Sequence, residues 1–201
     1  MIPSILNCMR FGTMLVFLAA SAATAAPSAE AVPDLQTLLQ NTVVEPPARV
    51  NFREERHNEI LREPLVLTGY LEYLRRNSLR KVVESPFEES FLIEAGQVTI
   101  EREGKSRTLP LGRSKSLRTL LTAIEAILAG DVAAILSSFD CELAGSEKSW
   151  SVLLTPTSSR IRQHIDIIQV NGNDRYVGSI RVDMQNGEWS LIQILHDDPE
   201  Q

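Results

Sequence analysis

The chain has few residues that could form disulfides or bind metals. Its 201 residues include 2 cysteines and 3 histidines. Cys8 lies in a segment that we expect to be removed, so Cys141 would remain alone, which excludes an internal disulfide framework. His57, His164 and His196 have no second histidine or cysteine at the spacing of metal ligands. We therefore expect no disulfide, no metal site and no cofactor.

The sequence also lacks the motifs of common catalytic sites. It has no serine in a G-x-S-x-G elbow and no glycine-rich phosphate loop. Cys141 follows an apolar segment, where a cysteine is more often a small buried hydrophobic residue than a nucleophile. Glu84, Glu88 and Glu89 flank Pro86, and a solvated turn is a better interpretation of them than an acid–base pair. These absences favour a binding protein over an enzyme.

Strong positive charge and long apolar runs are missing as well. The formal net charge is −6, so electrostatics gives the protein no reason to bind nucleic acid. Beyond the first 26 residues no apolar segment is long enough to cross a membrane. We expect no nucleic-acid partner and no transmembrane anchor.

The first residues have the order of a secretory signal. Arg10 is the only charge among residues 1–26, and an apolar stretch of about ten residues and then small residues follow it. Such a stretch is too short to anchor the chain permanently in a bilayer. We expect a signal peptide that is cleaved after Ala25 or Ala26. Residues 27–201 would then form a single exported domain.

The first part of this domain predicts a helix and then a sheet. Leucines at helical spacing follow Asp34, which can cap the helix, and Pro46-Pro47 ends it. Apolar and polar residues alternate from about Val50 to Arg107, with short turns between the alternating stretches. This part predicts a helix followed by an antiparallel meander.

The second part predicts helices and then more strands. Leu117 to Phe139 keeps helical spacing, and Gly130 interrupts it, so we expect two short helices at an angle. Alternation returns from about Ser149. Asn171-Gly172 and Asn186-Gly187 are dipeptides typical of two-residue hairpin turns. The apolar helical segment could be a permanent plug of the sheet or a lid on a cavity.

Short motifs in this chain resemble, in order and spacing, those of the LolA family, the periplasmic carriers of outer-membrane lipoproteins. The matching segments are Phe52-Arg53-Glu54, Gly69-Tyr70-Leu71, residues 75–81, Ser85-Pro86-Phe87-Glu88-Glu89, residues 117–121, residues 150–156 and Asn186-Gly187-Glu188. The resemblance implies an α+β fold, an incomplete, half-open antiparallel β-barrel closed by short lid helices. It also implies an apolar cavity for acyl chains.

The resemblance and the alternation together predict a site. The residues expected to line the cavity are Phe52, Leu67, Leu71, Tyr73, Leu79, Val83, Ile93, Val98 and Ile100 from the sheet, and Leu121, Ile124 and Leu128 from the lid. Arg75 stands where relatives have an arginine that bonds the lid helices and sets how readily they open. Leu79 and Lys81 replace an aromatic pair of the family. Lys81 is unusual in an apolar wall, and we expect it to reach the rim or an anionic head group.

The leading hypothesis is a monomeric carrier that moves lipoproteins from an inner-membrane donor transporter to an outer-membrane acceptor. A close alternative keeps the pocket but carries a free lipid or glycolipid, and Lys81 favours it. A second alternative is an envelope stress sensor or scaffold built on the same half-barrel. A lipid-processing enzyme would need a nucleophile or an acid–base pair at the pocket mouth, and the sequence offers only isolated candidates.

Overall fold

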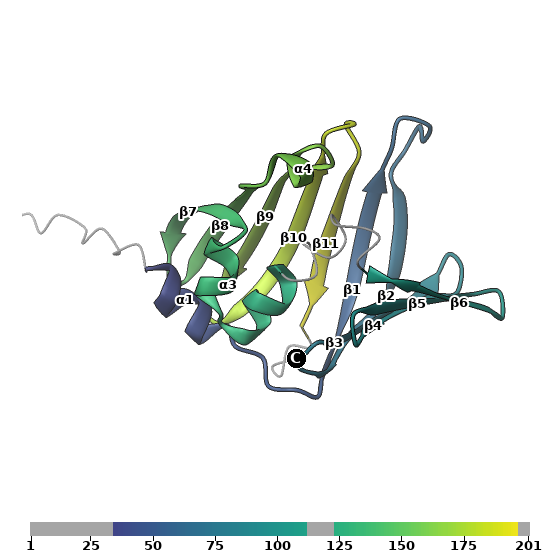
Figure 1. Ribbon diagram of the computed structural model, residues 1–201, viewed down its shortest axis with the longest axis horizontal. Coiled ribbons are helices and arrows are strands. Elements are labelled where there is room, and N and C mark those ends of the chain that lie inside the picture. Colours follow the sequence, from purple (N-terminus) through teal and green to yellow (C-terminus); the bar gives the residue numbers. More distant parts are fainter. Residues whose placement is uncertain (1–33, 112–122, 197–201) are drawn as a thin grey trace, which may run out of the picture.

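One large antiparallel sheet dominates the structure, a computed structural model that describes residues 34–111 and 123–196. Its 11 strands follow the order β6-β5-β4-β3-β2-β1-β11-β10-β9-β8-β7 (Figure 1). The strands are β1 (Ala48–His57), β2 (Leu65–Arg75), β3 (Ser78–Ser85), β4 (Glu89–Glu94), β5 (Gln97–Arg102), β6 (Lys105–Pro110), β7 (Phe139–Ser146), β8 (Ser149–Pro156), β9 (Ile165–Asn173), β10 (Tyr176–Met184) and β11 (Trp189–Leu195).

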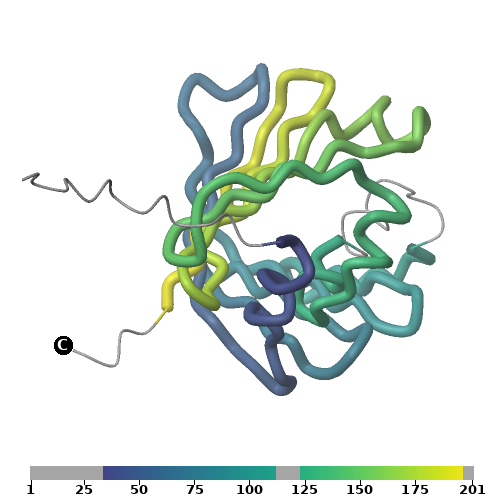
Figure 2. Tube along the Cα trace, turned by 90° about the vertical axis from the view of Figure 1, so that its left-hand side faces the viewer, coloured from purple at the N-terminus to yellow at the C-terminus, as the bar shows by residue number. Residues whose placement is uncertain are grey.

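The sheet consists of two meanders that join at its centre. Strands β1–β6 form one meander and β7–β11 the other, and β1 pairs with β11, where Phe52 lies opposite Ile194. Strands β6 and β7 end the strand order, so the sheet is not closed. It curves, with the helical segments on its concave side (Figure 2). The predicted half-open antiparallel barrel is therefore confirmed.

Short helices precede and separate the meanders. The first, α1 (Leu35–Asn41), begins as predicted at Asp34, whose carboxylate accepts a hydrogen bond from the Thr37 backbone at 2.9 Å. Residues 123–129 are helical, and α3 (Val132–Leu136) follows. A further short helix, α4 (Ser159–Arg162), lies between β8 and β9.

The predicted helical segment is shorter at its end than its spacing suggested. Its first residues lie outside the described part of the chain. Gly130 interrupts it as expected, and Asp131 caps α3 by accepting a hydrogen bond from the Ala134 backbone at 2.9 Å. Phe139, however, opens strand β7 and lies opposite Pro156 of β8. The apolar side chain fits either pattern, and strand pairing decides its conformation.

Of the two predicted Asn-Gly turns, one is confirmed and one is wrong. Gly187 has a φ of +80° between β10 and β11, and its amide donates to the Met184 carbonyl at 3.1 Å. Gly172 lies inside β9 instead. A Cβ there would come within 2.3 Å of the Trp150 ring and of the Tyr176 carbonyl oxygen. This glycine therefore serves close packing between strands rather than a turn.

The buried apolar residues form two clusters. The larger, which we call the helix–sheet core, joins α1, residues 123–129 and α3 to β7–β10; its largest members include Leu38, Ile135, Phe139, Trp150 and Leu154. In Figure 1 the helices accordingly lie across the β7–β10 part of the sheet. The smaller, which we call the sheet cluster, has Phe52, Leu67 and Val83 at its centre. The helices thus cover the second meander.

Candidate functional site

The nine sheet residues predicted to line a cavity lie on one face. Residues directly opposite each other in an antiparallel pair share a face. Tyr73 lies opposite Leu79, Leu79 opposite Ile93, and Ile93 opposite Val98. The same rule, followed through β1, β11, β10 and β9, places them on the face that carries Val152 against the helices. We call this side of the sheet the inner face.

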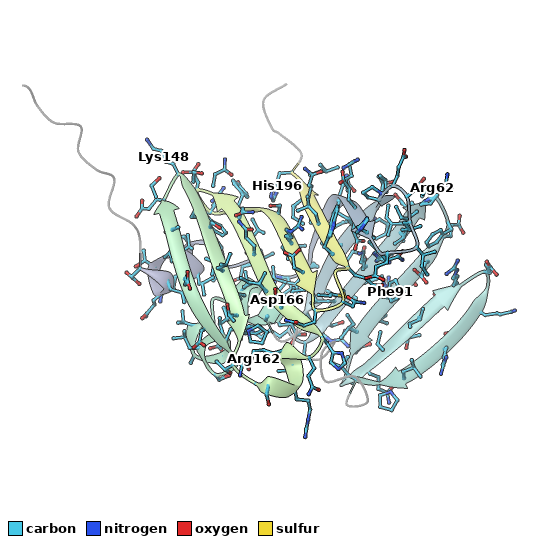
Figure 3. The ribbon with its side chains drawn as sticks, turned by 90° about the horizontal axis from the view of Figure 1, so that it is seen from above. Arg62, Phe91, Lys148, Arg162, Asp166 and His196 are labelled. Atoms are coloured by element: carbon cyan, nitrogen blue, oxygen red, sulfur yellow. The ribbon has the colours of Figure 1, made fainter. Side chains whose placement is uncertain are left out.

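Part of the inner face is not enclosed by either apolar cluster. Phe52, Leu67 and Val83 are already buried in the sheet cluster. On strands β3–β5, four other apolar side chains of this face are only partly buried and belong to neither cluster: Leu79, Phe91, Ile93 and Ile100. In Figure 3, Phe91 of β4 is labelled between the second meander and the β3–β6 strands. These side chains offer apolar surface that a ligand could cover.

The helical residues predicted to form the lid differ in burial. In the helix over residues 123–129, Ala123, Ala126 and Ile127 are buried in the helix–sheet core. Ile124 and Leu128, which we predicted to face the cavity, are half-buried. Leu121 lies outside the described residues. The helix therefore packs on the sheet mainly through the side that the prediction did not name.

Arg75, the predicted lid-gating residue, lies at the end of β2. Its guanidinium forms an ion pair with Glu94, the last residue of β4, and its side chain is exposed. Asn77 takes a φ of +59° in the turn that follows. The pair links neighbouring hairpins of the first meander. A contact with the lid helices stays a prediction.

Lys81 does not stand free on the inner face but belongs to a polar cluster of four residues: Glu54, Arg56, Lys81 and Ser190. The Lys81 ammonium donates to the Glu54 carboxylate, which also accepts from Arg56 Nε at 2.8 Å and from Ser190 Oγ at 2.7 Å. The side chains are 3%, 17% and 37% exposed for Glu54, Lys81 and Arg56. The cluster thus runs from a buried carboxylate to a half-exposed guanidinium.

Burial and pairing oppose each other in this cluster. Burial raises the pKa of Glu54, but the charges and hydrogen bonds of Lys81 and Arg56 outweigh burial, and the pKa lies below its ordinary value. Burial lowers the pKa of Lys81, and the charge of Glu54 opposes that effect only in part. The Lys81 ammonium also lies 4.8 Å from the centroid of the Phe52 ring. The ammonium therefore contacts both the aromatic ring and the carboxylate.

Charged residues continue beside the polar cluster at the same end of the sheet. Glu89 lies opposite Val83 on the inner face, and Arg102 Nη1 lies 3.9 Å from Glu89 Oε1. An open hollow at this end includes Val83, Glu89 and Arg102 in its lining. Of the three glutamates predicted to belong to a solvated turn, Glu84 and Glu88 are exposed. The prediction is wrong for Glu89, which begins β4 with a side chain only 11% exposed, and Glu84 itself lies in β3.

Other residues considered as chemical candidates have ordinary surroundings. His57 stacks on Trp189, with ring centroids 5.6 Å apart. Burial, followed by the charge of Asp140, raises the pKa of the half-buried Cys141 thiol to about 11. The described residues hold no group of three or more histidine, cysteine or acidic side chains placed for a metal ion. Across the same residues, no helix has the length and apolar character needed to span a membrane.

Comparison with known proteins shows the family. Residues 24–193 match the family described as outer membrane lipoprotein carrier protein LolA-like, so the chain belongs to this family. Its members are carriers rather than enzymes, which supports a binding role at the level of the family. No curated protein is significantly similar in sequence.

Several solved structures are similar in fold at low sequence identity. A LolA superfamily protein from Nitrosomonas europaea, NE2245, is 12% identical, with 83% of this chain and 95% of that chain covered and a TM-score of 0.43. A chain of the MucA/MucB complex of Pseudomonas aeruginosa is 12% identical, with 81% of this chain and 56% of that chain covered and a TM-score of 0.42. LprF from Mycobacterium bovis is 10% identical, with 83% of this chain and 94% of that chain covered and a TM-score of 0.39.

The sequence prediction missed three of the four residues in the polar cluster. Glu54 and Arg56 share the alternation of Phe52, so they had to lie on the same face as that predicted wall residue. That signal was present in the sequence. Ser190 could not be found in this way, because it reaches Glu54 from 136 positions away.

Proposed function

We propose that the protein is an exported carrier that holds acyl chains against the inner face of strands β2–β5. The observation that carries the proposal is the set of partly buried apolar side chains outside both clusters on the inner face of β3–β5: Leu79, Phe91, Ile93 and Ile100. Covering about ten CH₂ groups of a chain contributes about 8 kcal/mol, at roughly 0.8 kcal/mol each, before the cost of association. Half-buried Ile124 and Leu128 would complete the site from the helical side.

Family membership supports a lipoprotein as the cargo. The proposal is that residues 1–26 direct export and that residues 27–201 act as a single periplasmic domain. As a monomer, it would receive acylated cargo from an inner-membrane transporter and deliver it to an outer-membrane acceptor. If the protein carries lipoproteins, an acylated peptide should co-purify with protein isolated from the periplasm.

A free lipid or glycolipid is the second candidate cargo. The polar cluster favours it, because a buried Glu54–Lys81 pair places charge on a face that otherwise suits acyl chains. Mass spectrometry of organic extracts from the purified protein separates the two cargoes. Acylated peptide supports the first and free lipid the second. An extract with neither would favour a sensor or scaffold built on the same half-barrel.

The acyl-binding face can be tested with two neighbouring residues of one strand. Ile93 lies on the inner face, and Leu92, opposite Arg80, lies on the outer face. Ile93→Glu places a charge among the apolar side chains and is expected to abolish binding of a fluorescent fatty acid. Leu92→Glu, the matched control, should bind as the wild type does. Equal binding by both variants would place the site elsewhere.

We further propose that Arg75 influences how readily the lid opens, as the family resemblance implies. Its ion pair with Glu94 fixes the β2–β3 turn against β4, next to the apolar end of the inner face. Arg75→Leu is expected to change the rate at which a bound fluorescent fatty acid is released. Unchanged ligand retention together with unchanged stability would contradict the gating role.

A further inference from the structure

The inner face of the first meander changes from apolar to charged along the strands. The row of residues next to the β2–β3 turn is apolar: Tyr73, Leu79, Ile93 and Val98. The opposite end of the same face carries charges: Glu54, Arg56, Glu89 and Arg102. Lys81 starts between the two ends and extends to Glu54. An elongated amphiphile lying along the strands would therefore have one preferred direction.

The charged end retains hydrogen-bond donors. A lysine ammonium has three N–H donors and an arginine guanidinium has five. Glu54 accepts one bond from Lys81 and two from Arg56, the second at 3.2 Å from Nη2. Two N–H donors of Lys81 and three of Arg56 therefore take no part in the bonds to Glu54. Because Arg56 is 37% exposed, its free donors lie at the boundary with solvent.

The polar cluster itself carries a positive excess, although more acidic than basic side chains line the neighbouring hollow. Arg56 and Lys81 oppose Glu54 alone, which leaves one positive charge. Glu89 and Arg102 are themselves paired, so including them leaves the same excess. A single anionic group is the chemistry that this excess and these donors would bind.

Stability alone explains the polar cluster poorly. A buried ion pair commonly stabilises a protein no better than apolar side chains of similar volume. Apolar residues would also suit a wall for acyl chains. The charges therefore point to recognition rather than to folding.

We infer that the polar cluster is the head-group subsite for an acyl lipid with one anionic group, either a carboxylate or a phosphate. Arg56 and Lys81 bind the anionic oxygens, and Glu54 and Ser190 act as positioning residues for these two cations. The acyl chain runs from there towards Leu79 and Ile93. This inference rests on the proposed function and adds the class and the direction of the ligand.

Two probes that differ only in the anionic group test the inference. They are dansylamino-undecanoic acid and its neutral methyl ester, titrated by fluorescence against the full exported chain. The wild type is expected to bind the acid about tenfold more tightly than the ester, the ratio that one charge-assisted contact provides. Inorganic phosphate at millimolar concentration should not displace the acid, because it has no acyl chain.

Arg56→Gln and Glu54→Gln each remove one charge and should change the ratio of acid to ester affinity in opposite directions. Arg56→Gln keeps the Glu54–Lys81 pair and removes the excess charge, so the ratio of acid to ester affinity should fall to about one. Glu54→Gln should raise the ratio above that of the wild type. Arg80→Gln, a control on the outer face beside Lys81 that removes an equal charge near Glu72, should leave the ratio unchanged.

Each outcome decides a separate question. If Arg56→Gln keeps the wild-type ratio, the head-group inference is wrong, and binding of the ester still supports the acyl carrier. If neither probe binds the wild type, the proposed function itself fails. If phosphate alone displaces the acid, the cluster binds free anions and the lipid assignment is wrong. Arg56→Gln alone tests the head-group inference, so the test holds even if Glu54→Gln does not fold.

Discussion

Lys81 shows how a charged residue can lie in an otherwise apolar wall. Its ammonium lies over the ring of Phe52, which is 1% exposed, and also meets Glu54. Long cationic side chains commonly cover apolar surface with their stems while the charge finds a polar partner. A lysine at this position is therefore compatible with a buried Phe52.

Glu54 makes the stability of the protein depend on pH. Its pKa is lowered in the folded protein, so the carboxylate's stabilisation is present above its ordinary value of 4.5 and is lost as the pH falls through the folded value. Glu54→Gln should lower the free energy of unfolding by roughly 3 kcal/mol at pH 7, because Lys81 loses its charged partner.

The measurement is the urea unfolding midpoint of both proteins between neutral pH and the acid range below 4.5. The difference between them should shrink as the pH falls, since the wild type then loses its carboxylate. The pKa of Asp34 is also lowered, mainly by its hydrogen bond with Thr37, and that effect is common to both proteins. A difference that stayed constant with pH would contradict the assigned role of Glu54.

Cys141 should be an unreactive thiol. Its pKa of about 11, against an ordinary value of 9.0, reduces the thiolate fraction at pH 8 by about 100-fold. Alkylation by iodoacetamide at pH 8 is expected to be slower by about that factor than in the urea-unfolded chain. Similar rates in the two states would show that burial does not protect the thiol.

Strand alternation in the sequence decides which residues share a face, while their role as a cavity wall stays a prediction. The nine expected wall residues share one face because side chains alternate along every strand. The partners of a charged side chain could not be predicted in this way. Lys81 meets Glu54 across 27 positions, and no local pattern links the two.

At the scale of elements, strands β8 and β9 approach each other closely at Gly172. Gly172→Ala would push a methyl group against the Trp150 ring and is expected to cost about 1–3 kcal/mol in thermal or urea unfolding. Gly178→Ala in β10 is the matched control, because the nearest atom to its added Cβ lies 3.7 Å away. Equal effects of the two changes would indicate that close packing at Trp150 is not the cause.

The elements with local signals were predictable, and those decided by long-range packing were not. Asp34 and Gly187 mark a helix start and a hairpin turn through their own chemistry. Asn171-Gly172 carries the same turn signal as Asn186-Gly187. Its glycine is required by Trp150 instead, a residue on another strand. Phe139 was assigned to a helix because apolar spacing does not report strand pairing.

At the scale of the whole molecule, a bound acyl chain should stabilise the fold. Ligand at about 100 times its dissociation constant adds roughly 2.7 kcal/mol, because it binds the folded chain only. For a chain of this size that corresponds to a rise of roughly 5–10 °C in Tm. Calorimetry with a fatty acid should show this rise in the wild type and in Leu92→Glu but not in Ile93→Glu. A rise in all three would place the ligand away from the inner face.

The pairing of β1 with β11 has a consequence for how the molecule is assembled. Arg53 and Gln193, which bond across these strands, are 140 positions apart. Strand β1 therefore has no second neighbour until almost all of the chain is present. During synthesis its edge would be open to pairing with other chains. Contacts of such sequence separation also form slowly. Aggregation of unfinished or truncated chains should therefore begin at the strand that lies at the centre of the finished sheet.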